Sequence, residues 1–277
     1  MQHPIHDTMV SKDRSDYHMK KVFASDFDGT LYFYQADVKL PPENVEKIRE
    51  YQAAGNLFGL CTGRQVGGLT PFITGLIKPD FYITSTGANI VDGNLNEIYR
   101  RGIDRDIVDQ ICHTVNPVSV SEHRISIDIN GIINVFEEMD YPGEYHVITG
   151  MKDAMEGLVH QLGVHCHSYE EAAALAKKIN EMYGEHVNAF QNVVEVDIAP
   201  KGCTKGIGVE RLKKFYADKY DGIRLYGIGD SINDMPLLLA SDVSYTFPYA
   251  PKEVQEAATF VVDKITDALE HSMKEEV

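Results

Sequence analysis

The chain has 277 residues, 43% of them apolar, which is enough for a buried core, and the length suggests about two domains. Its 26 Lys and Arg stand against 42 Asp and Glu, so the formal net charge is −16. This charge, without a long basic block, argues against nucleic acid and anionic membranes as partners.

The N-terminal segment and the cysteines bear on the compartment. No stretch approaches the roughly 18 to 20 uninterrupted apolar residues that cross a bilayer, and residues 1–20 carry charges where a signal segment would be apolar. The four cysteines stand far apart, without a CxxC pair for a disulfide framework or a zinc knot. We therefore expect a cytoplasmic protein with reduced thiols and a mobile tail over residues 1–20.

From Lys21 onward, short β-branched or aromatic runs alternate with helical stretches. Strands are expected over residues 21–27, 56–61 and 81–85, with helices between them. The order strand, helix, strand, helix, strand is typical of a parallel sheet with crossover helices. The first part of the chain therefore predicts an α/β fold.

The middle of the chain, residues 88–192, has a different pattern. Two hairpins are expected, with turns at Asp92-Gly93-Asn94 and at Asn130-Gly131, together with helices over 104–116 and 170–183. This pattern favours an α+β insert. The α/β pattern resumes at 193–198 with a strand, so we predict one core of residues 21–87 and 193–277 interrupted by a second domain of residues 88–192.

Two aspartates end the first apolar strand. Asp26 and Asp28 are separated by one residue, and ligands of open α/β sheets bind beyond the carboxyl ends of the strands. Gly29 allows the chain to turn away just after them, so both acids can converge on one ligand. Alone, such a pair is also typical of a polar exit from a strand.

A second motif, Thr62-Gly63-Arg64, follows the next apolar strand. A hydroxyl and free backbone N–H groups at a strand end suit a phosphate or another oxyanion, although the same residues make an ordinary helix N-cap. Arg64 could bind a substrate carboxylate or a second phosphate, or pair with a surface acid.

Two further motifs begin helices in the second half of the chain. Lys205, which follows Thr204, opposes the helix macrodipole and therefore needs an anion nearby. Asp230, Asn233 and Asp234 follow a buried strand, and their oxygens suit a hard cation such as Mg²⁺. A capped helix start would use the same residues.

Together, these motifs resemble those of the haloacid dehalogenase superfamily and, more narrowly, of its Cof-type class IIB phosphatases. The resemblance covers the chain from about Lys21 to its C-terminus and is specific in the motifs but weak in the insert. It implies a Rossmann-like, doubly wound parallel-sheet core with an inserted α+β cap domain. It also implies a Mg²⁺-dependent phosphatase of small phosphorylated metabolites such as sugar phosphates. The matching motifs are residues 26–31, 62–64, 86–89, 204–206 and 229–234.

The resemblance further implies a role for each motif residue. Asp26 would take the phosphoryl group as an aspartyl phosphate, and Asp28 would protonate the leaving oxygen and then activate water. Thr62 and Lys205 would hold the phosphoryl oxygens. The Mg²⁺ ligands would be Asp26, Asp230 and the backbone carbonyl of Asp28, with Asn233 and Asp234 in support. Gly63 would be a further supporting residue of the site.

The stretch Thr246-Phe247-Pro248-Tyr249-Ala250 departs from the Gly-Asn-Ala run that is usual in the subfamily. We therefore expect a changed contact near the site. Two other functions remain open: a phosphomutase or phosphotransferase on the same site, and a receiver-like signalling module. The long insert and the second Asp of the first motif argue against a receiver. No protein partner is inferred.

A cluster of possible metal ligands lies in the insert, at His160, His165, Cys166 and His167. Strand alternation would place His165 and His167 on one face and Cys166 on the other. These side chains cannot easily meet at one ion, so we expect no metal site among them.

Overall fold

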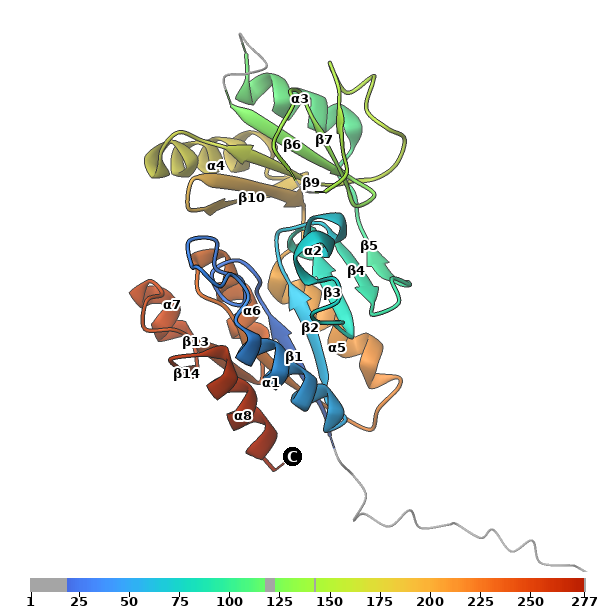
Figure 1. Ribbon diagram of the computed structural model, residues 1–277. Coiled ribbons are helices and arrows are strands. Elements are labelled where there is room, and N and C mark those ends of the chain that lie inside the picture. Colours follow the sequence, from blue (N-terminus) through green and yellow to red (C-terminus); the bar gives the residue numbers. More distant parts are fainter. Residues whose placement is uncertain (1–18, 118–122, 142, 277) are drawn as a thin grey trace, which may run out of the picture.

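The computed structural model describes residues 19–117, 123–141 and 143–276 (Figure 1). The predicted mobile tail lies outside these residues, apart from its last two positions. Within the described ranges, no helix combines the length and the apolar character needed to cross a bilayer.

A first sheet of eight strands carries the lower part of the molecule in Figure 1. Its strands are β1 (Lys20–Ser25), β2 (Leu57–Cys61), β3 (Phe81–Thr84), β4 (Asn89–Asp92), β5 (Glu97–Arg100), β12 (Ile223–Ile228), β13 (Val243–Thr246) and β14 (Phe260–Val261). Their order is β14-β13-β12-β1-β2-β3-β4-β5, parallel from β14 to β3 and antiparallel beyond. The parallel strands run outward in both directions from β1, which confirms the predicted doubly wound fold and places a ligand crevice at its centre.

Helices cover both faces of this sheet. They are α1 (Pro42–Ala53), α2 (Val66–Ile73), α5 (Lys205–Ala217), α6 (Met235–Ala240), α7 (Lys252–Ala257) and α8 (Ile265–Lys274), with short 3₁₀ turns η2 (Ser85–Gly87) and η3 (Ile232–Asp234). Phe23 packs in one core cluster with residues of α1 and α8, whereas Val22 packs in another with residues of α5. Because successive strand residues face opposite sides, β1 is buried on both faces and reads as a continuous apolar run.

A second sheet of six strands forms the upper part of the molecule in Figure 1. Its strands are β6 (Arg124–Ile129), β7 (Ile132–Val135), β8 (Tyr145–Val147), β9 (Val159–His165), β10 (Val187–Asn192) and β11 (Glu195–Pro200), in the order β10-β11-β9-β6-β7-β8. The helices α3 (Arg105–Val115) and α4 (Tyr169–Tyr183) cover its apolar face. The opposite, polar face turns toward the first sheet, because Gln161 and Asp128 hydrogen-bond across to it.

Sheet membership shifts the boundaries of the predicted insert. The β4–β5 hairpin, expected in the insert, pairs with β3 in the first sheet, and Ile90 is buried there beside Phe81. The strand β11, expected to resume the core, instead pairs with β9 and β10, so that prediction is wrong. The segment between Arg100 and Thr204 builds the second sheet and its helices. We call residues 101–203 the cap and the remainder the core.

Candidate active site

The carboxyl ends of β1, β2 and β12 meet at the edge of the first sheet that faces the cap (Figure 1). Asp26 directly follows β1, and its backbone N–H donates to the Ile228 carbonyl of β12 at 2.9 Å. A cavity of about 330 Å³ lies between this edge and the cap. The predicted site residues that line it are Asp26, Asp28, Thr62, Gly63, Arg64, Lys205 and Asn233.

Lys205 lies at the centre of the buried charges. Thr204 caps α5 by accepting a hydrogen bond from the Ile207 backbone, which fixes Lys205 as the first helical residue. Its Nζ donates to Oδ1 of Asp26 at 2.6 Å and to Oδ1 of Asp234 at 2.5 Å. Burial by itself lowers the pKa of Lys205, but these carboxylates outweigh it and raise that pKa well above the usual value. The predicted anion beside this helix start is confirmed.

Three carboxylates converge beside that ammonium. Ligand oxygens of Asp26, Asp230 and Asp234 all lie within 4.8 Å of one another. Burial, followed by repulsion from Asp234, raises the pKa of Asp26 well above its ordinary range. The same two causes raise the pKa of Asp230 to about 6. One ammonium does not balance three carboxylates, of which Asp26 and Asp234 are buried, so a further cation would relieve the repulsion.

The hydrogen bonds of these acids differ and indicate which of them could bind a cation. Oδ2 of Asp234 accepts from the backbone N–H groups of Asp230 and Ser231, both at 3.0 Å, so Asp234 shapes the loop after β12. Oδ1 of Asp230 accepts one bond from the Thr30 hydroxyl at 2.6 Å. Asp26 and Asp230 are thus the acids best placed to hold a cation. Their hard oxygen ligands fit Mg²⁺ or a similar divalent ion.

Asp28 and Arg64 form a two-point ion pair inside the cavity. Nε of Arg64 donates to Oδ2 of Asp28 at 2.7 Å, and Nη2 donates to Oδ1 at 2.9 Å. The guanidinium also lies over the rings of Phe27, Tyr34 and Phe72, with centroid distances of 5.7, 5.5 and 5.2 Å. Arg64 therefore pairs with an acid of the site instead of a surface acid. Both carboxylate oxygens of Asp28 are thus engaged by Arg64.

Thr62 and Gly63 lie where the core approaches the cap. The Thr62 backbone N–H donates to the Ile83 carbonyl at 2.9 Å, and its hydroxyl accepts from the Arg64 N–H at 3.2 Å. A Cβ added at Gly63 would lie 3.0 Å from Oδ2 of Asp197 in the cap. Glycine at position 63 thus allows the cap carboxylate to come close to the core.

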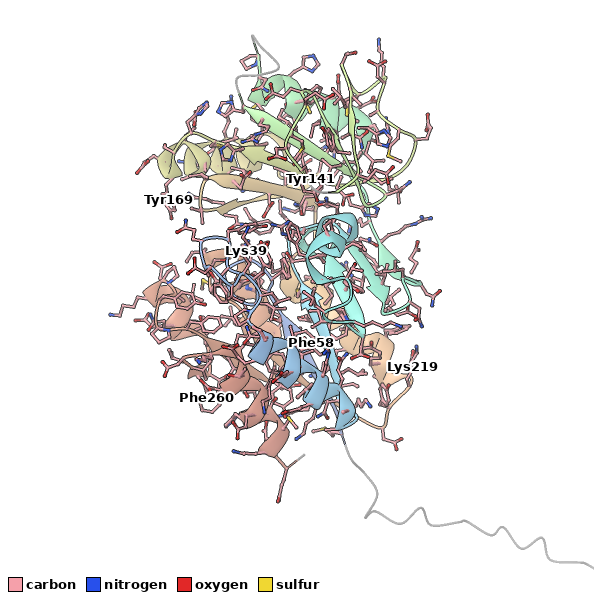
Figure 2. All side chains as sticks on the ribbon, in the orientation of Figure 1. Lys39, Phe58, Tyr141, Tyr169, Lys219 and Phe260 are labelled. Atoms are coloured by element: carbon pink, nitrogen blue, oxygen red, sulfur yellow. The ribbon has the colours of Figure 1, made fainter. Side chains whose placement is uncertain are left out.

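Polar residues of the cap line the side of the cavity opposite the core, and the motifs did not predict them. We call this side of the cavity its ceiling. Nε2 of Gln161 donates to the Gly63 carbonyl at 2.9 Å and to Asp197 at 3.1 Å, and its Oε1 accepts from Thr86 at 2.8 Å. Burial raises the pKa of Asp197 to about 6. Tyr141 lies at the junction of cap and core (Figure 2). The other cap residues of the cavity are Ser126, Gly163, Asn192 and Glu195.

A signal for this ceiling was present in the strand alternation. Ser126, Gly163 and Asp197 are register neighbours on β6, β9 and β11, so they share one face of the second sheet. Buried apolar residues such as Ile127 and Val196 point to the other face. Alternation alone does not tell which face meets the core, and the positions were therefore missed.

The departing stretch 246–250 contacts backbone carbonyls of the site loops through two side-chain hydroxyls. The hydroxyl of Tyr249 donates to the Gly29 carbonyl at 2.7 Å, and that of Thr246 donates to the Gly229 carbonyl at 2.8 Å. Phe247 is buried and stacks on Tyr249 with a centroid distance of 4.9 Å. The Tyr249 hydroxyl thus fixes the backbone of the loop that follows Asp28.

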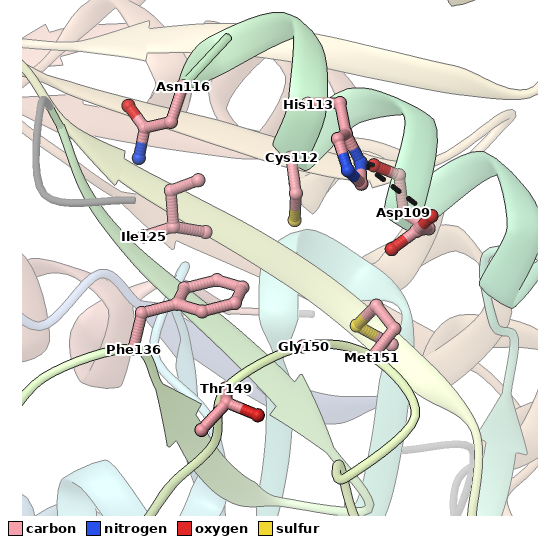
Figure 3. A pocket seen from close by; sticks show the side chains of 9 residues that line it. All are labelled: Asp109, Cys112, His113, Asn116, Ile125, Phe136, Thr149, Gly150 and Met151. Carbon is pink, nitrogen blue, oxygen red and sulfur yellow. Dashed lines mark hydrogen bonds and ion pairs between the residues drawn. The ribbon is translucent and has the colours of Figure 1, made fainter. Parts of the chain in front are cut away.

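A second hollow lies in the cap, away from these residues (Figure 3). It measures about 90 Å³ and lies between α3 and the strands β6 and β7, with Cys112 pointing into it. Its walls are mostly apolar, from residues such as Ile125, Phe136 and Met151. None of the predicted catalytic or metal-binding residues lines this hollow.

Comparisons with known proteins agree with the fold and the motifs. A family model of haloacid dehalogenase-like hydrolases matches residues 23–268. An HMP-PP phosphatase of Citrobacter koseri is 23% identical over 228 residues, which cover 79% of this chain and 81% of the relative.

Two solved structures share the fold over almost their whole length. A haloacid dehalogenase-like hydrolase from Bacteroides thetaiotaomicron has a TM-score of 0.76 at 16% identity, covering 91% of this chain and 99% of its own. A subclass IIB sugar phosphatase of the haloacid dehalogenase superfamily has a TM-score of 0.71 at 20% identity, covering 91% and 98%.

Proposed function

This chain belongs to the haloacid dehalogenase-like hydrolases, and we propose that it is a Mg²⁺-dependent phosphatase that hydrolyses small phosphorylated metabolites through an aspartyl-phosphate intermediate. The family match confirms the superfamily resemblance predicted from the motifs. The observation that carries the proposal is the buried contact of Lys205 with Asp26 and Asp234, beside Asp230, at the carboxyl ends of the central strands.

Two aspartates would carry the chemistry in two steps. In the first, a carboxylate oxygen of Asp26 attacks phosphorus, the bond from phosphorus to the substrate oxygen breaks, and Asp28 gives its proton to that oxygen. In the second, Asp28 takes a proton from water, whose oxygen attacks phosphorus and releases Asp26 and inorganic phosphate. General acid and base catalysis of this kind contributes roughly 10² to 10⁴ in rate.

The positive charges of the site would make these steps possible. A phosphate monoester is a dianion and would be repelled by the acids of the cavity unless cations balanced them. Lys205 and the Thr62 hydroxyl would hold the phosphoryl oxygens. When bound by Asp26, Asp230 and the backbone carbonyl of Asp28, Mg²⁺ would supply the remaining positive charge, as is general for metal-dependent phosphatases of this family.

The ceiling of the cavity supports a neutral, hydroxyl-rich leaving group. Carboxylates of Asp197 and Glu195 and the amides of Gln161 and Asn192 line the cap side, and such groups accept and donate hydrogen bonds to hydroxyls. The carboxylates of Asp197 and Glu195 would also repel a further anionic group of a substrate on this side of the cavity. We therefore favour sugar phosphates over substrates with further anionic groups.

A screen of phosphorylated metabolites tests the proposal. Purified enzyme with Mg²⁺ is expected to release inorganic phosphate from sugar monophosphates, and excess EDTA is expected to abolish the release until Mg²⁺ is restored. Undiminished turnover in EDTA, with the protein shown to be free of metal, would contradict the metal requirement.

The same assay separates hydrolysis from phosphoryl transfer. A phosphomutase or phosphotransferase would pass the group from Asp26 to an acceptor sugar, so phosphorylated acceptor would form in place of free phosphate. For a phosphatase, added acceptor sugar is expected to leave the yield of inorganic phosphate unchanged.

A further inference from the structure

A second group of metal-ligating side chains lies in the cap. The side chains of His123, Cys166 and Glu171 each offer one ligand atom, and these atoms lie within 4.8 Å of one another. They come from three places in the chain: just before β6, just after β9 and the first turn of α4. Cys166 is buried at 1% exposure, whereas His123 and Glu171 are partly buried.

The hydrogen bonds of Asn116 fix the orientation of the His123 ring. The Asn116 amide donates to the His123 carbonyl at 2.8 Å, so its Oδ1 faces the His123 backbone N–H at 2.8 Å and the ring Nδ1 at 3.3 Å. Because Oδ1 only accepts, Nδ1 carries the proton. In the neutral ring, Nε2 then presents its lone pair to the cluster, which is the arrangement of most metal-binding histidines.

That lone pair faces another acceptor. Nε2 of His123 lies 3.0 Å from Oε1 of Glu171, and Oε2 of Glu171 is held by the backbone N–H of His167 at 2.7 Å. A neutral imidazole and a carboxylate in this arrangement need a positive charge between them. That charge is either a proton on Nε2 or a metal ion, and a nearby thiol favours the metal.

Cys166 supplies that thiol. Its Sγ makes no hydrogen bond to any residue in the described ranges, although it lies beside the polar atoms of His123 and Glu171. Burial and the neighbouring Glu171 raise the pKa of Cys166 to about 11, and a bound cation would oppose both effects. The ring of His167 packs beside that of His123, with centroids 5.6 Å apart.

We propose that His123, Cys166 and Glu171 bind a Zn²⁺ ion in the cap. Thiolate, imidazole and carboxylate together match the ligand preference of zinc, whereas Mg²⁺ prefers oxygen alone. Histidine and cysteine neighbours in the sequence 165–167 were not expected to share a metal. The structure brings Cys166 together with His123, just before β6, and Glu171, in the first turn of α4, and the local sequence pattern around Cys166 does not contain His123.

The site lies next to the edge of the catalytic cavity. The backbone N–H of Cys166 donates to the Val194 carbonyl in the turn between β10 and β11 at 2.9 Å. Asn192 and Glu195 flank that turn and line the cavity. A metal at Cys166 would therefore hold together the starts of β6 and α4 and the end of β9, beside the outer rim of the cavity.

Cobalt titration of the full chain tests the zinc site without using activity. Metal-free, reduced protein is titrated with Co²⁺, and we expect one equivalent to give the near-ultraviolet charge-transfer absorption of a cobalt–thiolate bond. One equivalent of Zn²⁺ should then remove it. The Asp230→Asn protein should behave alike, because the carboxylates of the core site give no thiolate band.

Single substitutions locate the ligands. Cys166→Ser should abolish the band, and His123→Gln should weaken cobalt binding at least tenfold. Cys112→Ser is the matched control, because Cys112 is also a buried cap cysteine but points into the separate hollow of Figure 3, and it should keep the full band. Circular dichroism confirms that each variant is folded.

The outcomes separate clearly. A thiolate band that is lost with Cys166 and His123 but kept without Cys112 supports the site. No band in the wild-type protein would overturn it, as would a band of equal strength in Cys166→Ser. If Cys166→Ser fails to fold, the folded His123→Gln protein decides: unchanged cobalt affinity would show that His123 and Glu171 form only an ion pair.

Discussion

Lys205 shows how one buried ammonium organises the site. It is 2% exposed and joins Asp26, just after β1, to Asp234, at the end of η3. Removing such a partner leaves carboxylates buried without compensation. In the proposed reaction the same ammonium lies beside the phosphoryl oxygens, where a preorganised charge contributes most to rate.

Lys205→Met is therefore expected to lower kcat/KM by on the order of 10² or more and the free energy of unfolding by about 3 to 5 kcal/mol. Lys213→Met is the control, since Lys213 pairs with Asp242 at 2.8 Å near the surface. That change should cost about 1 kcal/mol or less and leave the rate unchanged. Phosphate-release kinetics and urea unfolding measure both. A Lys205→Met enzyme as fast as the wild type would reduce Lys205 to a structural role.

Asp197 gives a prediction about pH. Burial raises its pKa from 3.8 to about 6, so the folded state binds more protons than the unfolded state between these values. Stability therefore falls as the pH rises through this interval, by up to about 3 kcal/mol. Asp197→Asn stays neutral and retains an acceptor for Gln161, so it should be more stable than wild type at pH 7.

Urea unfolding at several pH values checks this expectation. The advantage of Asp197→Asn should shrink below pH 6 and vanish near pH 4. The same substitution at the exposed Asp221 should give no such dependence. If the difference in free energy of unfolding between the wild type and Asp197→Asn is the same at every pH, burial does not destabilise the Asp197 carboxylate.

At this scale the sequence predicted which residues line the cavity better than which of them pair. Asp26, Thr62 and Lys205 each lie within a few residues of a strand end or helix start, so local patterns were enough to predict that they meet. The pairing of Arg64 with Asp28 was left open, because a long side chain in a chain with 42 acids has many possible partners. Only the fold decides which acid lies within reach.

Among the elements, strands were easier to predict than the sheets they join. The strand β11 was predicted, but it was assigned to the wrong sheet. The reason lies in its sequence pattern, in which the apolar Val196 and Ile198 alternate with the acidic Glu195 and Asp197. Alternation is typical of a sheet with one polar face, whereas the central strands of a parallel core are apolar on both. Hydrogen-bond partners of a strand are set by tertiary packing, which one sequence does not contain.

The contact between β9 and the core gives the prediction at this scale. Gln161 joins Thr86 and Gly63 of the core to Asp197 of the cap through three hydrogen bonds. Gln161→Met keeps the volume and removes them, at about 0.5 to 1.5 kcal/mol for each bond. The arrangement in which the cap is held against the core should then be less populated, so KM for a sugar phosphate should rise about tenfold.

Gln191→Met is the matched control for Gln161→Met. Gln191 lies on β10 of the same sheet, and among the described residues its Nε2 donates only to the Tyr169 and Val193 carbonyls within the cap. Steady-state kinetics of both variants should show a raised KM for Gln161→Met alone. An unchanged KM for Gln161→Met would mean that this side chain does not hold the cap against the core.

For the molecule as a whole, charge and architecture together limit the function. In the proposed reaction, a chain of net charge −16 admits a phosphate dianion to a cavity whose own cations, Lys205 and Arg64, are already paired with carboxylates. The family, the doubly wound core and the cap over the strand ends all agree with phosphoryl chemistry. The role of each aspartate remains the central claim, and it is open to a direct test.

Trapping the phosphoenzyme tests that claim. Asp28→Asn removes the proton donor and base but leaves Asp26, and a nitrophenyl phosphate hardly needs a donor because its leaving group is a weak base. With Mg²⁺, this variant should transfer the phosphoryl group to Asp26 and then stall, so the covalent species accumulates. Rapid acid quench and peptide mass spectrometry should place the phosphoryl group on Asp26 and find none in Asp26→Asn. A phosphoryl group elsewhere in the Asp28→Asn protein, or any in Asp26→Asn, would contradict the account.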